Sequence, residues 1–268
     1  MAGSPFARIL GAAEEVKSDT SYHFNNTTRI PSEALVVQRT LAGAAYFEDA
    51  TGRHLVGVGR AMLFTHREDS RYGYPPDARE PYRLQYINFP STPALLSLFE
   101  LLRHDFGPVI NLPADSRAAV LFAEVVTTYQ RRRFDDVWQE CERLYSLLIA
   151  LYREQVQASK SRDPVEYGWH YLRSRFRQPI HLKAVAAACG VTREHFVRAF
   201  RKRYGETPGT LLRRLRLEHA RELLLATTLR VEEVALSSGF ASVNTFSRAF
   251  RQHYHGSPGR VRHRGRNE

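Results

Sequence analysis

The chain has 268 residues and only two cysteines, Cys141 and Cys189. Two cysteines cannot build a disulfide scaffold or a cysteine-based zinc module, and their scarcity indicates a reducing compartment. No apolar run approaches the ~20 residues that a helix needs to cross a bilayer. Residues 1–19 lack the uninterrupted apolar stretch of a signal peptide. We therefore expect a cytoplasmic protein with no membrane partner.

The motifs of the common catalytic sites are missing as well. No nucleophile elbow, phosphate-binding loop or dinucleotide fingerprint occurs in a suitable context, and Gly57–Arg60 is too short to cradle a phosphate. His54 and His66 are the only histidines between residues 34 and 89, and no His-x-His pair occurs in that segment. A metal-dependent enzyme is therefore a distant alternative. We expect a protein that is not an enzyme, with no catalytic residue, no metal site and no cofactor.

Acidic residues are scarce in one part of the chain. Residues 1–164 contain 19 Lys and Arg against 20 Asp and Glu, whereas residues 165–268 contain 20 against 8, a net charge of +12. This asymmetry predicts a basic module that binds a polyanion, joined to a neutral module with another task. Charge alone does not distinguish nucleic acid from an acidic membrane, so the pattern of side chains has to decide.

The neutral part is expected to be α+β, with strands before helices. The first ~30 residues show no strong period, and we expect a loose tail there. Segments rich in Val, Leu, Tyr and Phe alternate with turn signals between Ala34 and Phe89, which favours an antiparallel sandwich or a small barrel. Helical periodicity follows over residues 93–106, 115–129 and 135–155.

The third of these helices has an apolar stripe close to heptad spacing. Packing onto the sheet and a seam between two subunits explain the stripe equally well, and both can hold at once. The small polar residues before Pro164 indicate a linker. We predict one domain over residues 1–158, a linker over 159–164 and a second domain over 165–268. The stripe consists of Val137, Cys141, Leu144, Leu148, Leu151 and Tyr152.

The basic part contains an internal repeat. Eight positions of Phe196–Gly209 recur in Phe246–Gly259 at a shift of 50 residues, and three positions just upstream recur at a shift of 49. Each copy reads as a short helix, a glycine break at Gly190 or Gly239, and a second helix with a Thr or Ser cap. Two helix-turn-helix units are therefore predicted, with helix breaks also at Gly205 and Gly256.

The second helix of each copy has one face to bury and one face to expose. Phenylalanines fall at helical spacing on one side, and arginines with other polar residues fall on the other. Arginine bonds guanine in a fork, asparagine suits adenine, glutamate accepts from cytosine, and valine contacts the thymine methyl group. A solvated charged surface explains a single such helix, but two copies in a domain of charge +12 favour the major groove of double-stranded DNA. The expected phosphate contacts, which give affinity rather than sequence choice, are Arg201, Lys202, Arg203 and Arg251.

A helix of about 16 residues between the two copies would act as a stiff spacer, roughly 24 Å long. Its inward positions are expected to be Leu212, Leu215, Ala220, Leu223 and Leu224. A spacer of this length could place two recognition helices ~34 Å apart, one turn of DNA.

Residues 165–263 resemble the AraC/XylS family of bacterial transcription regulators. The resemblance rests on VAAACGVTREHFVRAFRKRYGETPGTLLRRLRLEHARELLL and on VEEVALSSGFASVNTFSRAFRQHYHGSPGRVR. It implies a seven-helix DNA-binding domain with two helix-turn-helix motifs that read successive major grooves on one DNA face. The positions that match base-reading slots of the family are Glu194, Val197 and Arg198 in the first motif and Asn244, Ser247 and Arg248 in the second, with Val243 as a further candidate.

The segment RYGYPPDAREPYRLQYINF resembles part of the cupin-type sensor domain of sugar-responsive members of this family. The resemblance implies a cupin-like β-barrel that binds a small effector, with Tyr72 at the place of a sugar-stacking tyrosine. Small barrels hold ligands in their mouths, and the strand region supplies further candidates. The effector-binding candidates are Tyr72, Arg39, Tyr46, His66, Tyr74 and Tyr86.

These patterns predict a sequence-specific transcription regulator, by family usage an activator that works with RNA polymerase. Its first domain is expected to bind a carbohydrate-like effector and to pair two subunits into a homodimer. An alternative is a constitutive regulator whose first domain only dimerises. The patterns do not identify the operator, the regulated genes or the effector.

Overall fold

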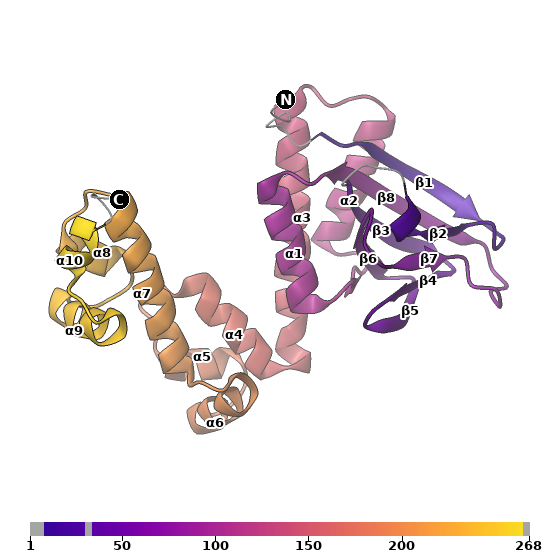
Figure 1. Ribbon diagram of the computed structural model, residues 1–268. Helices are drawn as coiled ribbons and strands as arrows, with labels where there is room; N and C mark the ends of the chain where they lie inside the picture. The colour runs from indigo at the N-terminus through magenta and orange to yellow at the C-terminus, as the bar shows by residue number, and fades with distance from the viewer. Residues whose placement is uncertain (1–7, 30–33, 265–268) are drawn as a thin grey trace. The chain divides into compact units, whose positions relative to one another are not determined.

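The computed structural model describes residues 8–29 and 34–264. The chain divides into two compact units, Met1–Gln155 and Val156–Glu268 (Figure 1). None of the described helices is long and apolar enough to cross a membrane.

The first unit contains two antiparallel sheets. One has the strand order β1-β8-β3-β6-β9 and the other has the order β2-β7-β4-β5. The strands are β1 (Gly11–Lys17), β2 (His23–Asn25), β3 (Ala34–Ala42), β4 (Ala44–Asp49), β5 (Gly52–Gly57), β6 (Arg60–Thr65), β7 (Arg71–Gly73), β8 (Tyr82–Pro90) and β9 (Val109–Asn111). A short 3-10 helix, η1 (Asn26–Thr28), follows β2.

The predicted closed barrel is wrong, because no described strand joins one sheet to the other by a backbone ladder. The sheets associate through side chains instead. The alternation of apolar and polar residues along a strand does not distinguish a sandwich from a barrel, because each architecture buries one face of every strand. The two open sheets correspond to the antiparallel sandwich, the other architecture that the strand pattern favoured.

A strand is also present where a loose tail was expected. β1 pairs with β8 over its whole length, from Gly11 opposite Asn88 to Lys17 opposite Tyr82. Its sequence, GAAEEVK, has little β-branched character, so the pairing with β8 determines its conformation more than local propensity does.

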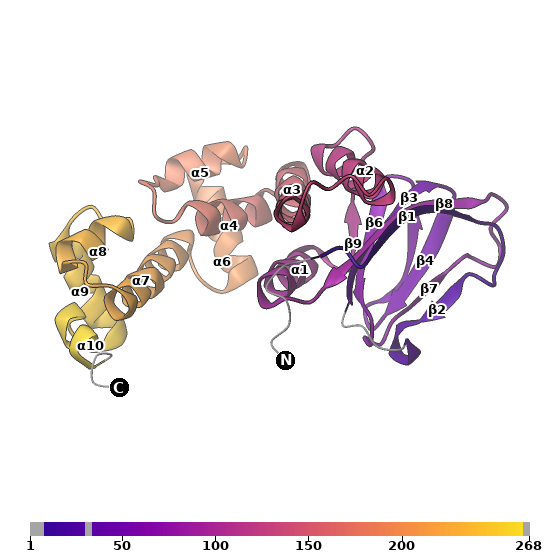
Figure 2. The same cartoon turned by 90° about the horizontal axis from the view of Figure 1, so that it is seen from above.

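The five-stranded sheet is buried on both faces. Along β3, Leu35 and Val37 pack with the helices, whereas Val36 packs against the other sheet. The helices are α1 (Pro93–Phe106), α2 (Arg117–Gln130) and α3 (Val137–Arg162), and Figure 2 shows them together on one side of the strands. Leu144, Leu148 and Leu151 of the predicted α3 stripe are buried in this layer, which confirms packing onto the sheet as one use of the stripe.

The residues predicted as a linker, 159–164, are helical for most of their length. Helix α3 continues to Arg162, and α4 (Pro164–Arg175) begins one residue after Asp163. The polar residues of 157–162 include no glycine or proline to end the helix. The Asp163 side chain caps α4 by accepting from the backbone N–H groups of Val165 and Glu166.

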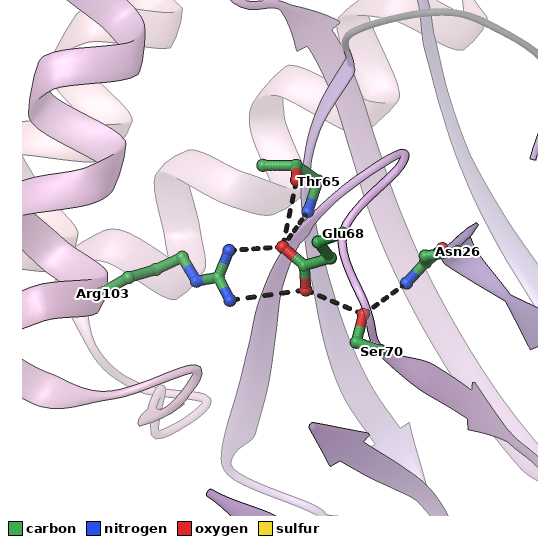
Figure 3. Close-up of polar contacts among 5 residues, drawn as sticks. All are labelled: Asn26, Thr65, Glu68, Ser70 and Arg103. Atoms are coloured by element: carbon green, nitrogen blue, oxygen red, sulfur yellow. Dashed lines mark hydrogen bonds and ion pairs between the residues drawn. The ribbon is translucent and has the colours of Figure 1, made fainter. Parts of the chain in front are cut away.

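A polar cluster fixes the loop between β6 and β7 (Figure 3). The Glu68 carboxylate accepts from the backbone N–H and the hydroxyl of Thr65, at 2.9 and 3.0 Å, and from the Ser70 hydroxyl at 2.8 Å. Arg103 of α1 donates to the two carboxylate oxygens at 2.5 and 3.3 Å, and the buried Asn26 amide donates to Ser70 at 2.8 Å. Charge-assisted bonds of this kind hold the loop against α1 and set the start of β7.

The second unit is helical. Its helices after α4 are α5 (Leu182–Ala188), α6 (Arg193–Tyr204), α7 (Pro208–Ala226), α8 (Val231–Ser237), α9 (Val243–Tyr254) and α10 (Pro258–Arg264). The predicted spacer is α7, with 19 residues and a length of roughly 28 Å. Leu212, Ala220 and Leu224 are buried as expected, and Leu215 and Leu223 are partly buried against the cores.

Candidate nucleic-acid interface

The first helix-turn-helix unit consists of α5 and α6. Gly190 follows α5 with a φ of 71°, a left-handed conformation that favours glycine. The Thr192 side chain accepts from the backbone N–H of His195 at 3.2 Å and so caps α6. The predicted turn and cap are confirmed at both residues.

Helix α6 has the two faces that its sequence predicts. Phe196 and Phe200 are fully buried in the core, while Glu194, Arg198 and Arg201 are exposed and Val197 is partly exposed. The outer face lines a shallow hollow, which brings predicted base-reading and phosphate-binding residues together. Its lining consists of Arg193, Glu194, Val197, Arg198, Arg201, Lys202 and Thr207.

The second unit repeats this arrangement with α8 and α9. Gly239 has a φ of 85°, and Ser242 caps α9 by accepting from the backbone N–H of Thr245 at 3.3 Å. Phe246 and Phe250 are fully buried. On the opposite side Asn244, Arg248 and Arg251 are exposed, with Val243 and Ser247 partly exposed.

The two recognition helices end differently. Gly205 follows α6 with a φ of 74°, as predicted, whereas His255 follows α9 with a φ of 52°. The predicted break at Gly256 is therefore one residue late. The residue that ends a helix in the left-handed conformation is usually glycine. The sequence therefore pointed to Gly256, although the neighbouring His255 has this conformation.

The exposed arginines form a positive surface on both helices. Of the described carboxylates, none is within ion-pairing distance of Arg198, Arg201, Arg248 or Arg251. Within α9, Arg251 Nε donates to the Ser247 carbonyl at 3.2 Å. Unpaired guanidinium groups on an exposed helix face remain available to phosphates and guanine edges.

Arg203 differs from the other predicted phosphate contacts. It forms an ion pair with Asp163 and lies 3.9 Å from a carboxylate oxygen of Glu166. Next to it, Tyr204 stacks on Trp169 of α4 with ring centroids 5.7 Å apart. Arg203 therefore joins α6 to α4, and a phosphate would have to compete with two carboxylates for it.

Three of the six effector-binding candidates share the space between the sheets of the first unit. Tyr72, Tyr74 and Tyr86 belong to the inter-sheet core or pack against it. The Tyr72 ring contacts Phe64, with centroids 4.6 Å apart, and burial raises the pKa of its hydroxyl above the usual value. The Tyr74 hydroxyl donates to the carbonyl of Glu80 at 3.0 Å, which closes the loop before β8.

The other three candidates lie elsewhere. Arg39 is on the helix side of the five-stranded sheet, where it donates to Gln85 at 2.7 and 2.9 Å and to the Ala119 carbonyl at 2.9 Å. Tyr46 follows the inward Ala45 on β4, and its hydroxyl meets the His23 ring nitrogen. His66 contacts Arg29 at 2.9 Å. The structure thus does not bring the six residues into one site.

The space between the sheets also contains buried polar groups that the sequence analysis did not identify. The Tyr22 hydroxyl donates to Gln38 at 3.2 Å, and the Gln38 amide donates to the Tyr82 hydroxyl at 3.0 Å. Burial raises the pKa of Tyr82 to about 12. A signal was present, because Gln38 interrupts the apolar run ALVVQRTLA of β3 at an inward position.

Comparisons with known proteins identify the helical part of the chain. A family model described as a helix-turn-helix domain matches residues 185–264. The lactose operon transcription activator of Staphylococcus xylosus is 25% identical over 125 residues, which is 45% of each chain. The xylose operon regulatory protein of Escherichia coli K12 is 32% identical over 97 residues, 36% of this chain and 25% of the relative. The chain thus spans less than half the length of these curated relatives.

Solved structures also match this region. The DNA-binding domain of AdpA, in complex with a target DNA, is 28% identical with a TM-score of 0.38, and the match covers 39% of this chain and 95% of that one. Residues 185–264 thus carry a helix-turn-helix domain of the AraC/XylS type, the region that the chain shares with these transcription regulators.

Proposed function

We propose that the chain regulates transcription by binding operator DNA through α6 and α9. The observation that carries this proposal is the repeated exposure of arginines on two equivalent helices, Arg198 with Arg201 and Arg248 with Arg251. No carboxylate of the described residues pairs with any of the four. Each helix is supported from behind by two fully buried phenylalanines. The base-reading role is assigned to Glu194, Val197, Arg198, Val243, Asn244, Ser247 and Arg248, and the phosphate-binding role to Arg201, Lys202 and Arg251.

Selection of preferred sites from a random DNA library, followed by hydroxyl-radical footprinting with the full chain, tests this function. We expect one preferred sequence per subunit with two protected segments about 10 base pairs apart, because two recognition helices enter successive major grooves. Protection of only one segment would show that a single helix-turn-helix unit reads DNA. Enrichment of no sequence would show binding without sequence choice and would contradict the proposal.

The mode of regulation is assigned as activation, in which the bound protein recruits RNA polymerase. The matched relatives include proteins named as activators, the lactose operon transcription activator and the HTH-type transcriptional activator RhaS of Escherichia coli. We assign the same mode to this chain, with two copies bound as a homodimer.

The first unit is assigned the binding of a small carbohydrate between its two sheets. Aromatic faces next to buried amide and hydroxyl groups suit sugars, which present both apolar faces and hydroxyls. Tyr86 is the most accessible of the inward tyrosines, and Gln38 and Tyr82 lie on the same inner face. A first unit that serves only dimerisation is the second candidate, favoured by the exposed Trp138 and Ile149 of α3.

Thermal denaturation of the full chain with a panel of neutral mono- and disaccharides distinguishes these two assignments. A ligand at ~100 times its Kd stabilises the folded state by about 2.7 kcal/mol, enough to raise the melting temperature measurably. We expect Tyr86→Ala to abolish that rise. Tyr46→Ala is the matched control, because Tyr46 lies outside the inter-sheet core. If no sugar raises the melting temperature, the dimerisation role is favoured.

A further inference from the structure

The second unit is built around two separate cores rather than one. The first core contains Phe196 and Phe200 with residues from α4, α5 and the beginning of α7. The second contains Phe246 and Phe250 with residues from the rest of α7 and from α8. Helix α7 contributes to both, and Figure 1 shows it running from the side of α5 and α6 to the side of α8, α9 and α10. The angle between the recognition helices therefore depends on α7 and on whatever else joins the two halves.

A guanidinium on α7 makes one such joint. Arg216 Nε donates to the Phe176 carbonyl at 2.7 Å, and Nη2 donates to the Gln178 carbonyl at 2.8 Å. These carbonyls lie at and just beyond the C-terminal end of α4, where backbone acceptors lack helical partners and a positive charge is favourable. Arg216 is half-buried, and its burial lowers the pKa of the guanidinium from the usual value. The guanidinium donates to the two carbonyls from two different nitrogens held in one rigid plane, whereas a lysine carries its donors on a single nitrogen at the end of a flexible stem.

The turn of the second helix-turn-helix unit packs on the same place. A Cβ atom at Gly239 would lie 2.7 Å from the Phe176 carbonyl oxygen, 2.9 Å from that of Arg177 and 2.9 Å from Arg216 Nε. The turn before α9 thus contacts the end of α4 directly. At the equivalent Gly190 of the first unit, an added Cβ would meet nothing within 4 Å. Both glycines have positive φ, so only the close approach distinguishes them.

Further contacts surround this junction. The Phe176 ring packs edge-on against His219 of α7, with centroids 5.4 Å apart. The His219 ring nitrogen lies 3.2 Å from the hydroxyl of Ser238, which is fully buried. The end of α4, the middle of α7 and the α8–α9 turn therefore meet in one packed junction.

We propose that Arg216 and Gly239 form a clamp that fixes the distance and angle between α6 and α9, and so determines which spacing of DNA half-sites the protein accepts. The proposal rests on the proposed function, in which both helices read DNA. Arg216 and Gly239 are positioning residues, since they act through the two recognition helices and contact carbonyls of the protein itself.

A distance measurement without DNA tests the clamp independently of DNA binding. Spin labels would be attached to the full chain by His195→Cys on α6 and Gln252→Cys on α9, both exposed, in a Cys141→Ser background that keeps the buried Cys189. Double electron–electron resonance between the two labels should give a narrow distance distribution for the chain with no further substitution. We expect Arg216→Met to broaden it, while Arg213→Met, which removes the same charge from an exposed position on α7, leaves it unchanged.

A pair of glycine variants provides a second test that does not depend on the arginine. Gly239→Ala and Gly190→Ala impose the same left-handed strain on an alanine, but only the alanine at 239 meets neighbouring backbone. We expect Gly239→Ala to shift or broaden the distance distribution and Gly190→Ala to leave it as in the wild type. Circular dichroism checks that each variant is folded. Unchanged distributions for both Arg216→Met and Gly239→Ala would overturn the clamp.

The consequence for DNA is measured with operators in which zero, one or two base pairs are inserted between the half-sites. We expect the wild type to lose affinity by ~10-fold or more for the longer spacings, because a rigid pair of helices fits one separation. Arg216→Met should reduce that loss to less than ~3-fold, while Arg213→Met keeps it. Equal spacing dependence in both variants contradicts the clamp. If no operator exists, the proposed function fails, whereas the distance measurement still decides the clamp.

Discussion

Replacing Arg198 and Arg248 together by alanine is expected to weaken binding to the selected operator by about 2–6 kcal/mol, since each base-reading arginine contributes ~1–3 kcal/mol. Both guanidinium groups are exposed and have no described ion-pair partner, so the protein loses no internal bond in the variant. The losses should be nearly additive, because the residues lie on separate helices with separate cores. Fluorescence anisotropy with operator and scrambled DNA measures both affinities.

The matched control removes the same charge from the phosphate-binding positions. Arg201→Ala with Arg251→Ala should weaken operator and scrambled DNA by similar factors and reduce the slope of log K against log salt by about 2. The base-reading pair should instead act mainly on the operator and relax base choice at one position in each half-site. If the two double variants lowered affinity for scrambled and operator DNA alike, the division between base reading and phosphate binding would be wrong.

The DNA-binding unit could be predicted far better than the first unit, for a physical reason. A helix-turn-helix unit is specified by contacts close in sequence: the glycine at the turn, the hydroxyl at the cap, and phenylalanines four residues apart. All of these occur twice, at Gly190 and Gly239, Thr192 and Ser242, and in the two Phe pairs. The ion pair of Arg203 could not be predicted, because its partner Asp163 lies 40 residues earlier in the sequence.

The first unit depends on contacts that are distant in sequence. Strand β1 exists because β8, about 70 residues later, supplies its hydrogen bonds. The separation of the effector candidates follows from the pleat, because neighbouring residues of β3 such as Gln38 and Arg39 face opposite sides of the sheet. Sequence marks these residues as polar within apolar strands but does not show which sheet will cover each face.

Truncation of a single buried phenylalanine should unfold one half of the DNA-binding unit before the other. Phe250 is fully buried in the second core, and Phe→Ala in a core costs about 3–5 kcal/mol. Half of the unit has roughly 50 residues and a stability of only roughly 2.5–7.5 kcal/mol at typical values per residue. We therefore expect Phe250→Ala to unfold α8, α9 and α10 wholly or in large part.

Hydrogen exchange measured by mass spectrometry distinguishes the two halves, with Phe200→Ala as the matched variant in the first core. Phe250→Ala should remove protection from α9 and leave it in α6, whereas Phe200→Ala should do the reverse. The fluorescence of Trp169, which packs against the first core, should change in Phe200→Ala but not in Phe250→Ala. Loss of protection in both recognition helices from either substitution would mean that the shared helix α7 and the Arg216 junction couple the cores into one cooperative unit. Separate loss would mean that the clamp orients two independently stable halves, so that its strength governs the spacing of half-sites without governing folding.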